Sequence, residues 1–576
     1  MDNNIVNDLN VPSVKDELTG VYTMSWLMTQ LYPAGPIKVA PDAIVLFFNV
    51  MNFQSFNRRF GFLGGNDYLR NLAMEMTNIF VDDLVARAGG DHFIIITKNL
   101  TEQQVVHKLA ELDSAMLKHD RGLHLHLKTG IYHSDGSEPL FVMLIDRAKM
   151  ACDVVSKVYD RDYVFFDDEL KKKNELRQYA VEHFEEALAK GHFTVYYQPV
   201  IRAITGEVCG YEALARWNDP VHGMIPPSIF VEVLESVRLI HKLDNFIVNR
   251  VCQDISDHIN KGYVCEPVSI NLSRLDFELC DVKKLLADAI ERNNIPKDYL
   301  IVEITESAAA TGMQMLVDEL SAIREYGLQV WIDDFGSGYS SFNNLQLYDF
   351  DTLKIDMEFV KGIGVNPKSE VIISAIISMS KRLSLPTLAE GVETKEQFEF
   401  LKRVGCEKIQ GYYFGKPAPK EAFALVKDST LANLEDPEYR KYYDVACSLN
   451  FLSSAPLRSA DPNLLKSGGL INGTPFTLIE YDRAADKVNF IFYNKAYEMF
   501  FSSFGIKSID DVQDYFGDQG QKTMREVFAE AESKPCERIV FEVELTDEII
   551  LHCRVRFLAH HKDRSIFGYV VRRKDT

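Results

Sequence analysis

Hydrophobic positions along the chain recur in short runs that alternate with helical stretches. Between residues 193 and 415 one unit repeats: an apolar run of strand length, a polar site, then a helical stretch. The apolar runs are FTVYYQPV, CGYEALARW, PVSINLS, YLIVEITES, QVWIDDFG, DTLKIDMEF, LPTLAEGVE and KIQGYYFG. Strands that alternate with helices in this number predict a (β/α)₈ barrel, and an open doubly wound sheet is the alternative that the pattern leaves open.

The pattern differs on either side of this region, so we predict a multidomain chain. Residues 13–168 mix β-rich runs with amphipathic stretches and predict an α/β domain, and the charged residues 169–190 predict one connecting helix. The barrel domain is then expected over 191–428. A stretch rich in Ser, Pro and Gly indicates a linker within 429–470, and long alternating strands predict a small α+β domain over 471–576.

Composition limits the classes of function. The 576 residues are 46% hydrophobic, as in ordinary globular proteins, and carry a net charge of −21, which disfavours a nucleic-acid polymer as partner. No apolar run approaches the roughly 20 residues of a membrane-spanning helix, and the acidic, polar start is unlike a signal peptide. The 9 cysteines include no Cys-x-x-Cys pair. We therefore expect a cytoplasmic protein without a zinc ribbon or a disulfide framework.

Polar side chains gather late in the predicted barrel strands. The run VWIDD ends in Asp333 and Asp334, and on a regular strand these would point to opposite faces, which buries one charge unless something compensates it. Because the carboxyl ends of barrel strands meet on one face, the whole set is expected in one cleft. It comprises Gln198, Glu212, Asn271, Glu303, Glu306, Asp333, Asp334, Lys354, Asp356, Glu390, Glu393 and Gln410.

This set indicates a metal site. Several carboxylates held together cannot all stay ionised at pH 7 without counter-charge, and only Lys354 offers one. Oxygen ligands without paired His or Cys favour Mg²⁺ or Mn²⁺ over Zn²⁺, and adjacent aspartates can serve two ions. The loop GSGYSS partly matches a dinucleotide-binding motif, but Ser341 takes the place of its third glycine and two acids precede it, which disfavours a pyrophosphate.

Seven ordered motifs then resemble one family. They are YEALARW (211–217), INLS (270–273), EITES (303–307), DDFGSGYSS (333–341), LKID (353–356), AEGVET (389–394) and QGYYFGKP (410–417), and together they resemble the EAL-domain cyclic-di-GMP phosphodiesterases. The resemblance implies a barrel that hydrolyses one phosphodiester bond of cyclic-di-GMP to linear pGpG with two Mg²⁺ or Mn²⁺ ions. It also implies a homodimer formed through the EAL domain.

The resemblance further implies the metal ligands. Asp333 would bridge two ions, one of them completed by Asp334 and, directly or through water, Glu390. The full implied ligand set is Glu212, Asn271, Glu303, Asp333, Asp334 and Glu390. None of these positions departs from the family pattern, so an active enzyme is expected, and a catalytically silent cyclic-di-GMP receptor is the alternative.

The same resemblance implies the residues that act on the substrate. Lys354 would orient the nucleophilic water and, with Glu212 and Glu390, form the catalytic set. Glu306 would hold the glycine loop 335–341. Substrate contacts are implied at four positions, namely Gln198, Leu214, Arg216 and Gln410.

The first domain resembles the GGDEF diguanylate cyclases through RAGGDHF (87–93) and DELTGVY (16–22). His92 stands where the family needs a metal-binding acid, and Asn49 replaces the other one. Of the guanine-contacting pair, Asn57 is kept and Asn66 replaces an Asp. Without the two acids, Mg²⁺ and a triphosphate lack support, so we predict that this domain is an inactive cyclase. This opposes a bifunctional enzyme and leaves open a regulatory role for GTP or another ligand.

The last domain carries a shorter resemblance. The stretch VNFIFYNKAYEMFF (488–501) resembles the strand and helix start of PAS-type sensor domains, where an Asn such as Asn494 opens the helix. No haem or flavin motif accompanies it, and its aromatic residues are expected in the core. The complete expectation is therefore a GGDEF-like domain, an EAL barrel and a PAS-like domain.

Overall fold

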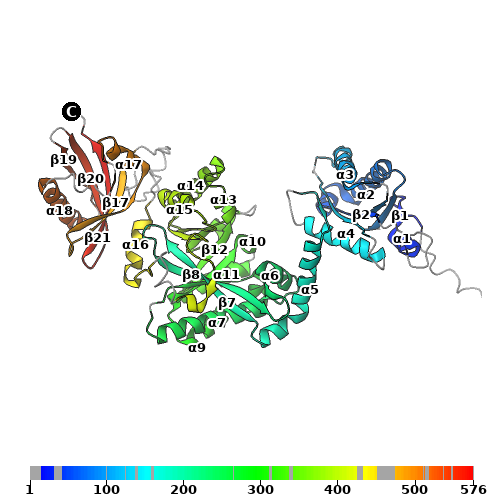
Figure 1. Cartoon of the computed structure of the whole chain (residues 1–576), viewed down its shortest axis with the longest axis horizontal. Coiled ribbons are helices and arrows are strands. Elements are labelled where there is room, and N and C mark those ends of the chain that lie inside the picture. The colour runs from blue at the N-terminus through cyan, green and yellow to red at the C-terminus, as the bar shows by residue number, and fades with distance from the viewer. Residues whose placement is uncertain are drawn as a thin grey trace, which may run out of the picture. The chain divides into compact units, whose positions relative to one another are not determined.

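The computed structural model describes most of the chain. The described residues are 14–31, 42–98, 100–122, 125–135, 141–156, 161–263, 265–310, 314–336, 341–423, 433–449, 474–506, 508–509, 512, 518–535, 537–546 and 549–574. They fall into two compact units, residues 1–179 and 180–576 (Figure 1). No helix in the described part of the chain is both long and apolar enough to cross a membrane.

The first unit is a six-stranded sheet with helices on both faces. Its strand order is β1-β3-β4-β2-β5-β6. The strands are β1 (Tyr22–Thr23), β2 (Ile44–Val50), β3 (Leu84–Gly89), β4 (His92–Thr97), β5 (Leu127–His133) and β6 (Tyr163–Phe165). The helices are α1 (Met24–Leu31), α2 (Phe53–Ile79), α3 (Glu102–Met116), α4 (Phe141–Val155) and α5 (Asp168–Ala189), the last of which continues into the second unit.

Alternation along β2 explains this layering. Ile44, Leu46 and Phe48 belong to a core shared with α2 and α3, whereas Val45 and Phe47 belong to one shared with α1 and α4. Successive side chains of a strand face opposite sides, so an unbroken apolar run serves two cores. Buried β2 thus forms the centre of the sheet.

The second unit contains a closed barrel of eight strands, surrounded by helices (Figure 1). The strands are β7 (Phe193–Arg202), β8 (Val208–Asp219), β10 (Val268–Asn271), β11 (Leu300–Thr305), β12 (Gln329–Phe335), β13 (Thr352–Ile355), β14 (Thr387–Ala389) and β15 (Lys408–Gln410). The short strands β9 (Gly223–Ile225) and β16 (Ala418–Pro419) extend the sheet. The helices are α6 (Pro227–Ser236), α7 (Ile240–Asn260), α8 (Arg274–Leu279), α9 (Val282–Asn293), α10 (Glu306–Ala309), α11 (Gln314–Tyr326), α12 (Ser341–Leu347), α13 (Met357–Lys361), α14 (Pro367–Arg382) and α15 (Lys395–Val404).

One barrel strand runs against the others. Strand β7 is antiparallel to both of its neighbours, β8 and β15, while the remaining neighbouring strands of the barrel pair in parallel. The expectation that all the strands present their carboxyl ends on one face is therefore wrong for β7. Gln198 still reaches that face because the register places it opposite Glu212. The carboxyl end of β7, at Arg202, lies at the opposite end of the barrel, which we call the floor.

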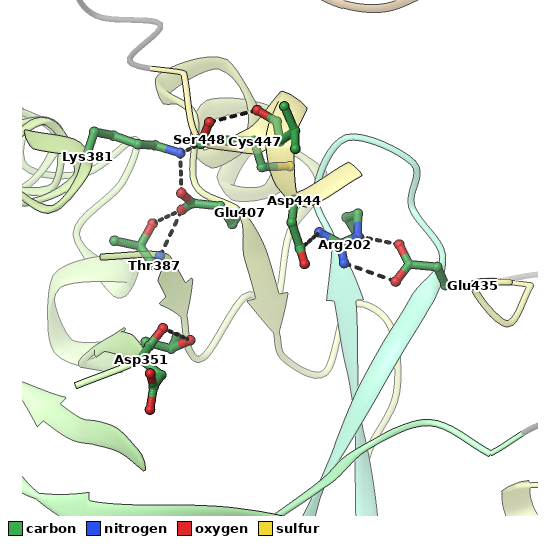
Figure 2. Close-up of polar contacts among 11 residues, drawn as sticks. Arg202, Asp351, Lys381, Thr387, Glu407, Glu435, Asp444, Cys447 and Ser448 are labelled. Atoms are coloured by element: carbon green, nitrogen blue, oxygen red, sulfur yellow. Dashed lines mark hydrogen bonds and ion pairs between the residues drawn. The ribbon is translucent and has the colours of Figure 1, made fainter. Parts of the chain in front are cut away.

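The chain after the barrel folds back onto this floor. Residues 433–449, within the expected linker, contain a short 3₁₀ turn (Pro437–Tyr439) and α16 (Arg440–Cys447). Leu434 forms a parallel bridge with Val208, and Arg202 is held between Glu435 and Asp444 (Figure 2). Arg202 and Glu435 are both fully buried. This segment is consequently part of the barrel's structure rather than a bare connection.

The last part of the chain is a five-stranded antiparallel sheet with two helices. The strand order is β18-β17-β21-β20-β19. The elements are β17 (Phe476–Asp482), β18 (Lys487–Tyr493), α17 (Lys495–Ser502), α18 (Asp518–Ser533), β19 (Ile539–Thr546), β20 (Ile549–His561) and β21 (Arg564–Arg573). Asn494 caps α17 by accepting from the backbone N–H of Tyr497 at 2.9 Å, as the sequence indicated. The PAS-type assignment stays a prediction.

Candidate functional site

The acidic residues of the barrel converge at the carboxyl ends of the parallel strands. Glu212 lies on β8, Glu303 on β11 and Asp333 on β12, and all three are buried. Glu390 follows β14 directly. These positions are up to 178 residues apart in sequence (390 − 212), so only the closed barrel brings them together.

Lys354 on β13 lies at the centre of this group. Its Nζ is 2.6 Å from Glu303 Oε2, 3.1 Å from Asp333 Oδ1, 2.5 Å from Glu390 Oε1 and 3.8 Å from Glu212 Oε1. The lysine is fully buried, so these contacts are not screened by water. One ammonium group thus faces four carboxylates.

The carboxylates form two overlapping groups. Ligand atoms of Glu212, Glu303 and Asp333 lie within 4.8 Å of one another, and so do those of Asp333, Asp334 and Glu390. Asp333 belongs to both groups. An arrangement of two acid triads that share one aspartate has the donor set for two hard cations side by side.

Local backbone geometry explains how two adjacent aspartates serve one site. Asp334 has a φ of 54°, in the left-handed region that non-glycine residues seldom adopt. The pairing of β12 with β13 shifts register between Ile332 and Phe335, and Asp333 Oδ1 accepts the backbone N–H of Asp334 at 2.8 Å. The bend turns both carboxylates toward the same cluster, which a regular strand would prevent.

Electrostatics show that the cluster lacks positive charge. Burial raises the pKa of Glu303 to about 8, with Lys354 opposing and neighbouring acids adding to the shift. Burial and the adjacent Asp333 raise the pKa of Asp334 to about 6. The pKa of Glu390 is also raised by burial, although Lys354 opposes the shift. Divalent cations would supply the missing charge.

A carboxylate oxygen without a hydrogen bond also supports a cation site. Glu303 Oε1 is buried and has no hydrogen-bond partner among the described residues. A buried carboxylate oxygen without a donor is costly, and a cation would satisfy it. The residues present therefore fit a site for hard divalent ions.

Amide side chains complete the wall beside Glu212. Asn271 Nδ2 donates to Glu212 Oε1 at 2.8 Å, and Gln410 Nε2 donates to Glu212 Oε2 at 2.6 Å. Gln410 Nε2 also lies 3.1 Å from Gln198 Oε1, and Gln198 Nε2 donates to the carbonyl of Gly415. The predicted ligand Asn271 and the predicted pocket residues Gln198 and Gln410 thus form one hydrogen-bonded chain with Glu212.

Glu306 lies at the base of the glycine loop. Its Oε2 accepts the backbone N–H of Gly336 at 2.7 Å, and its carbonyl accepts from Asn344 at 3.1 Å. It therefore contacts the first part of the loop and the helix α12 that follows it. Residues 337–340 of the predicted loop lie outside the described part of the chain.

Of the predicted substrate residues of β8, Arg216 lies beside an aromatic ring. Leu214 and Arg216 are half-buried, and the Arg216 guanidinium lies 5.5 Å from the centre of the Tyr196 ring. Desolvation lowers the pKa of Arg216, and Tyr412 contributes an opposing effect. Sequence reasoning missed Tyr196 and Tyr412, although the runs FTVYYQPV and QGYYFGKP display both of them.

Two strand-end acids do not join the two groups. The Asp356 side chain caps α13 by accepting the backbone N–H of Glu358 at 2.7 Å. Glu393 is exposed. Acidic residues at these two strand ends therefore have the ordinary capping and solvated roles.

The cyclase-like positions occupy one end of the first unit's sheet. Asn49 of β2 and His92 of β4 are directly opposed in the strand register. Asn49 Nδ2 donates to Ser156 Oγ at 3.3 Å, and His92 Nδ1 lies 3.5 Å from Asp91 Oδ1. The two positions at which the sequence departs from the expected acids are thus neighbours.

The predicted guanine-contacting positions lie on α2. Asn57 precedes the break in this helix at Gly61 and Asn66 follows it. The Asn57 side chain is close to Gly65, where an added Cβ would lie 1.9 Å from Asn57 Oδ1. A larger residue at 65 would therefore have to displace the Asn57 side chain.

Two family models match the chain. The diguanylate cyclase GGDEF domain matches residues 13–157, and the EAL domain matches residues 181–417. A GGDEF domain therefore precedes an EAL domain.

Curated relatives and solved structures agree with this order. The Pseudomonas aeruginosa bifunctional diguanylate cyclase/cyclic di-GMP phosphodiesterase MucR is 30% identical over 66% of this chain and 56% of its own length. The chain spans about half the length of the first curated relatives it matches, at 51%, 53% and 56%.

Among solved structures, a MucR phosphodiesterase in complex with c-di-GMP is 33% identical over 42% of this chain and 99% of that chain, with a TM-score of 0.41. The Vibrio cholerae LapD S helix-GGDEF-EAL structure bound to c-di-GMP has a TM-score of 0.53 and covers 69% of this chain and 95% of that chain. At 18% identity, the LapD likeness concerns the fold alone.

Proposed function

Since the chain belongs to the EAL domain family and carries a GGDEF domain ahead of the EAL domain, we propose that it hydrolyses cyclic-di-GMP to linear pGpG with divalent metal ions. The single observation that carries this proposal is the pair of carboxylate groups that share Asp333. The name of the curated relative MucR, a bifunctional diguanylate cyclase/cyclic di-GMP phosphodiesterase, supports the choice of substrate.

The residues of the cluster have distinct roles in this proposal. Glu212, Asn271, Glu303 and Asp333 would hold one Mg²⁺ or Mn²⁺ ion, and Asp333, Asp334 and Glu390 would hold a second. When bound, such a pair supplies a nucleophile at neutral pH and stabilises the charge on the attacked phosphoryl group.

The protein's own residues position the reaction. Lys354 forms ion pairs with Glu303 and Glu390. Its ammonium group would also stabilise negative charge on the substrate phosphoryl group and orient the attacking water. Arg216 would contact a phosphate from the neighbouring rim. The hydrogen bonds from Asn271 and Gln410 fix both oxygens of Glu212, which keeps its carboxylate oriented.

The test is hydrolysis of cyclic-di-GMP by the full chain, with Mn²⁺ or Mg²⁺ present and again with EDTA, and with pGpG followed by chromatography. Metal-dependent pGpG supports the proposal. Absence of pGpG at every metal concentration would contradict it.

A non-hydrolysing receptor is the second candidate. The observation in its favour is that the ammonium group of Lys354 faces four carboxylates and so supplies part of the positive charge that cations would otherwise provide. Tight binding of cyclic-di-GMP in EDTA, unchanged by Mn²⁺ and without turnover, would select this candidate.

We further propose that the GGDEF domain does not form cyclic-di-GMP. The opposed pair Asn49 and His92 supports this, because neither side chain can act as a carboxylate ligand for Mg²⁺. Incubation with GTP and Mg²⁺ should give no cyclic-di-GMP or pGpG, and appreciable formation of either would overturn the proposal. Both products are measured because the EAL domain would consume any cyclic-di-GMP formed.

A further inference from the structure

Glu407, a buried residue at the barrel floor, joins three strands of the barrel. It directly precedes β15. Its Oε2 accepts the backbone N–H of Thr387 at 2.8 Å and the Thr387 hydroxyl at 2.5 Å, and its Oε1 accepts from Lys381 Nζ (Figure 2). Its backbone carbonyl accepts the N–H of Ala203, just after β7, at 2.9 Å. One glutamate thus holds together the amino ends of β14 and β15 and the carboxyl end of β7.

The strands that Glu407 holds carry two side chains of the acidic cluster. Thr387 is the first residue of β14, and Glu390 directly follows that strand. Gln410 is the last residue of β15, three positions after Glu407. A strand rises about 3.3 Å per residue, so each of these side chains starts only about 10 Å from the floor contact. The two strands pair in parallel, and β14 is buried along its whole length. In a close-packed interior, a displacement at Glu407 would therefore reach both side chains.

Both side chains contact charged residues of the cluster. Glu390 Oε1 lies 2.5 Å from Lys354 Nζ, and Gln410 Nε2 donates to Glu212 Oε2 at 2.6 Å. Glu390 also belongs to the carboxylate group that it forms with Asp333 and Asp334. The geometry of this group consequently depends on the position of β14.

Helix α16 fixes the position of Lys381. The Lys381 ammonium group donates to the carbonyl of Cys447, the last residue of α16, as well as to Glu407 (Figure 2). A cation suits this place because the last carbonyls of a helix lack partners within the helix. On its other side, α16 packs against the C-terminal sheet through Tyr442 and Tyr443. Lys381 therefore connects Glu407 to a helix that is held from both sides.

We propose that Lys381 and Glu407 are positioning residues for the metal-binding carboxylates, and that α16 supplies the contact that fixes them. Helix α16 lies beyond residue 417, where the EAL match ends. The inference rests on the proposed function, because it assigns to the floor an effect on the same metal site. It requires that removal of Lys381 weaken Mn²⁺ binding at the opposite end of the barrel in a protein that remains folded.

The experiment measures Mn²⁺ binding to the full chain through the electron paramagnetic resonance signal of free Mn²⁺. Binding to Asp333→Asn is subtracted, because it reports ions bound elsewhere. Lys381→Met removes the ammonium group and keeps an unbranched, flexible side chain. We expect this variant to bind Mn²⁺ about tenfold more weakly than wild type, at the lower end of the effects of removing residues that support metal ligands. Wild-type affinity in folded Lys381→Met would overturn the proposal.

A matched substitution on α16 separates positioning from a general loss of stability. Arg440→Met breaks another floor ion pair, the one with Glu266, which precedes β10 rather than β14 or β15. It should lower the free energy of unfolding and leave the Mn²⁺ affinity unchanged. If Arg440→Met weakens Mn²⁺ binding as much as Lys381→Met does, the effect is general and the proposal fails.

A second pair of variants guards against misfolding. If the circular dichroism of Lys381→Met differs from that of wild type, the Thr387 hydroxyl is tested instead. Thr387→Val removes the hydroxyl that donates to Glu407 and keeps the branched shape, whereas Thr387→Ser keeps the hydroxyl. Weaker Mn²⁺ binding by folded Thr387→Val than by Thr387→Ser supports the proposal, and equal binding overturns it.

The wild-type measurement tests the metal site separately. A wild-type chain that binds no more Mn²⁺ than Asp333→Asn would contradict the metal site of the proposed function. A wild-type chain that binds Mn²⁺, but no more tightly than folded Lys381→Met, would contradict the role of the floor contact alone. Neither result depends on hydrolysis of cyclic-di-GMP.

Discussion

The two ends of the barrel both bury charged side chains, but they balance them differently. At the carboxyl end of the parallel strands, one lysine, Lys354, faces four carboxylates, and Asp334 adds a fifth acid nearby. At the floor the numbers of positively and negatively charged side chains match more closely. There Arg202 pairs with Glu435 and Asp444 (Figure 2), Lys381 with Glu407, and Arg440 with Glu266.

This difference in charge balance distinguishes a candidate cation site from a group of structural ion pairs. Each end has one glutamate oxygen that is buried without a hydrogen bond in the described structure, Glu266 Oε1 at the floor and Glu303 Oε1 at the other end. The ends differ in charge balance, because four carboxylates share the ammonium group of Lys354. At the floor each buried acid has its own cation, and Glu407 Oε2 also accepts from the N–H and the hydroxyl of Thr387. Surplus negative charge that the fold does not compensate indicates a place for cations, whereas a compensated cluster indicates stability.

The largest effect is expected when the shared aspartate, Asp333, is replaced. Asp333→Asn takes a charged ligand from both groups, so hydrolysis of cyclic-di-GMP should fall on the order of a thousandfold or more. The measurement is initial pGpG formation at saturating Mn²⁺. Asp349→Asn, at a side chain that is 91% exposed, is the control and should keep wild-type activity. Comparable rates for the two variants would end the assignment of the acidic cluster as the site.

The next largest effect is expected when the charge balance at the floor is disrupted by removing Arg202. Arg202→Met leaves Glu435 buried without its partner, so the free energy of unfolding of the barrel should fall by about 3–5 kcal/mol. Urea unfolding followed by the fluorescence of the buried Trp217 and Trp331 reports on this domain. Trp26 of the first unit should be replaced by Phe in every protein compared, so that the fluorescence comes from Trp217 and Trp331 alone.

Two further variants sharpen this measurement. Arg274→Met makes the same change in a surface pair and should cost about 1 kcal/mol or less. The double variant Arg202→Met/Glu435→Met should recover much of the lost stability, because it no longer buries an unpaired charge. If Arg202→Met alone is as stable as wild type, the Arg202–Glu435 pair is not a stabilising contact.

A third effect follows from adding ions. Mn²⁺ at about 100 times its dissociation constant should stabilise the barrel by about 2.7 kcal/mol, because it binds only the folded site. The rise should be largely lost in Asp333→Asn and retained in Arg274→Met. A similar rise in Asp333→Asn would place the bound ions elsewhere.

The smallest effect is a pH dependence at the floor. Burial raises the pKa of Glu266 to about 7, with Arg440 opposing the shift. Because the folded-state pKa lies above the unfolded value near 4.5, this residue's stabilising contribution is full below about pH 4.5 and is lost as the pH rises through 7.

Glu266→Gln should therefore remove a pH-dependent difference on the order of 1 kcal/mol between pH 5 and pH 8. The urea midpoint of this variant is compared with that of wild type at both values. An unchanged pH dependence would mean that Glu266 does not titrate in this range.

The barrel and its acids could be predicted from the sequence because they are locally encoded. Each apolar run carries its strand period, and each functional residue stands at the end of such a run, as in EITES and DDFGSG. The predicted loss of the two cyclase acids is equally local, because it follows directly from Asn49 and His92 at those positions of the sequence. The GGDEF and EAL domains and their order are confirmed by the family matches.

Other features depended on positions far apart in the chain. Arg202 and Glu435 are separated by 233 residues, and neither lies in a motif that indicates the other. Strand β7 has an ordinary apolar pattern, and only its pairing with β8 and β15 shows that it runs against them.

By itself, the sequence determined which chemical groups this protein carries at its strand ends, and it placed Asn49 and His92 at the predicted positions of the cyclase acids. The tertiary structure alone decided that Asp333 belongs to two carboxylate groups, that Asp334 bends with a φ of 54° to join it, and that one lysine must balance them all. The physical reason is that strand periodicity is a property of neighbouring residues. Charge balance, in contrast, is a property of residues that only the closed barrel brings within a few ångströms of one another.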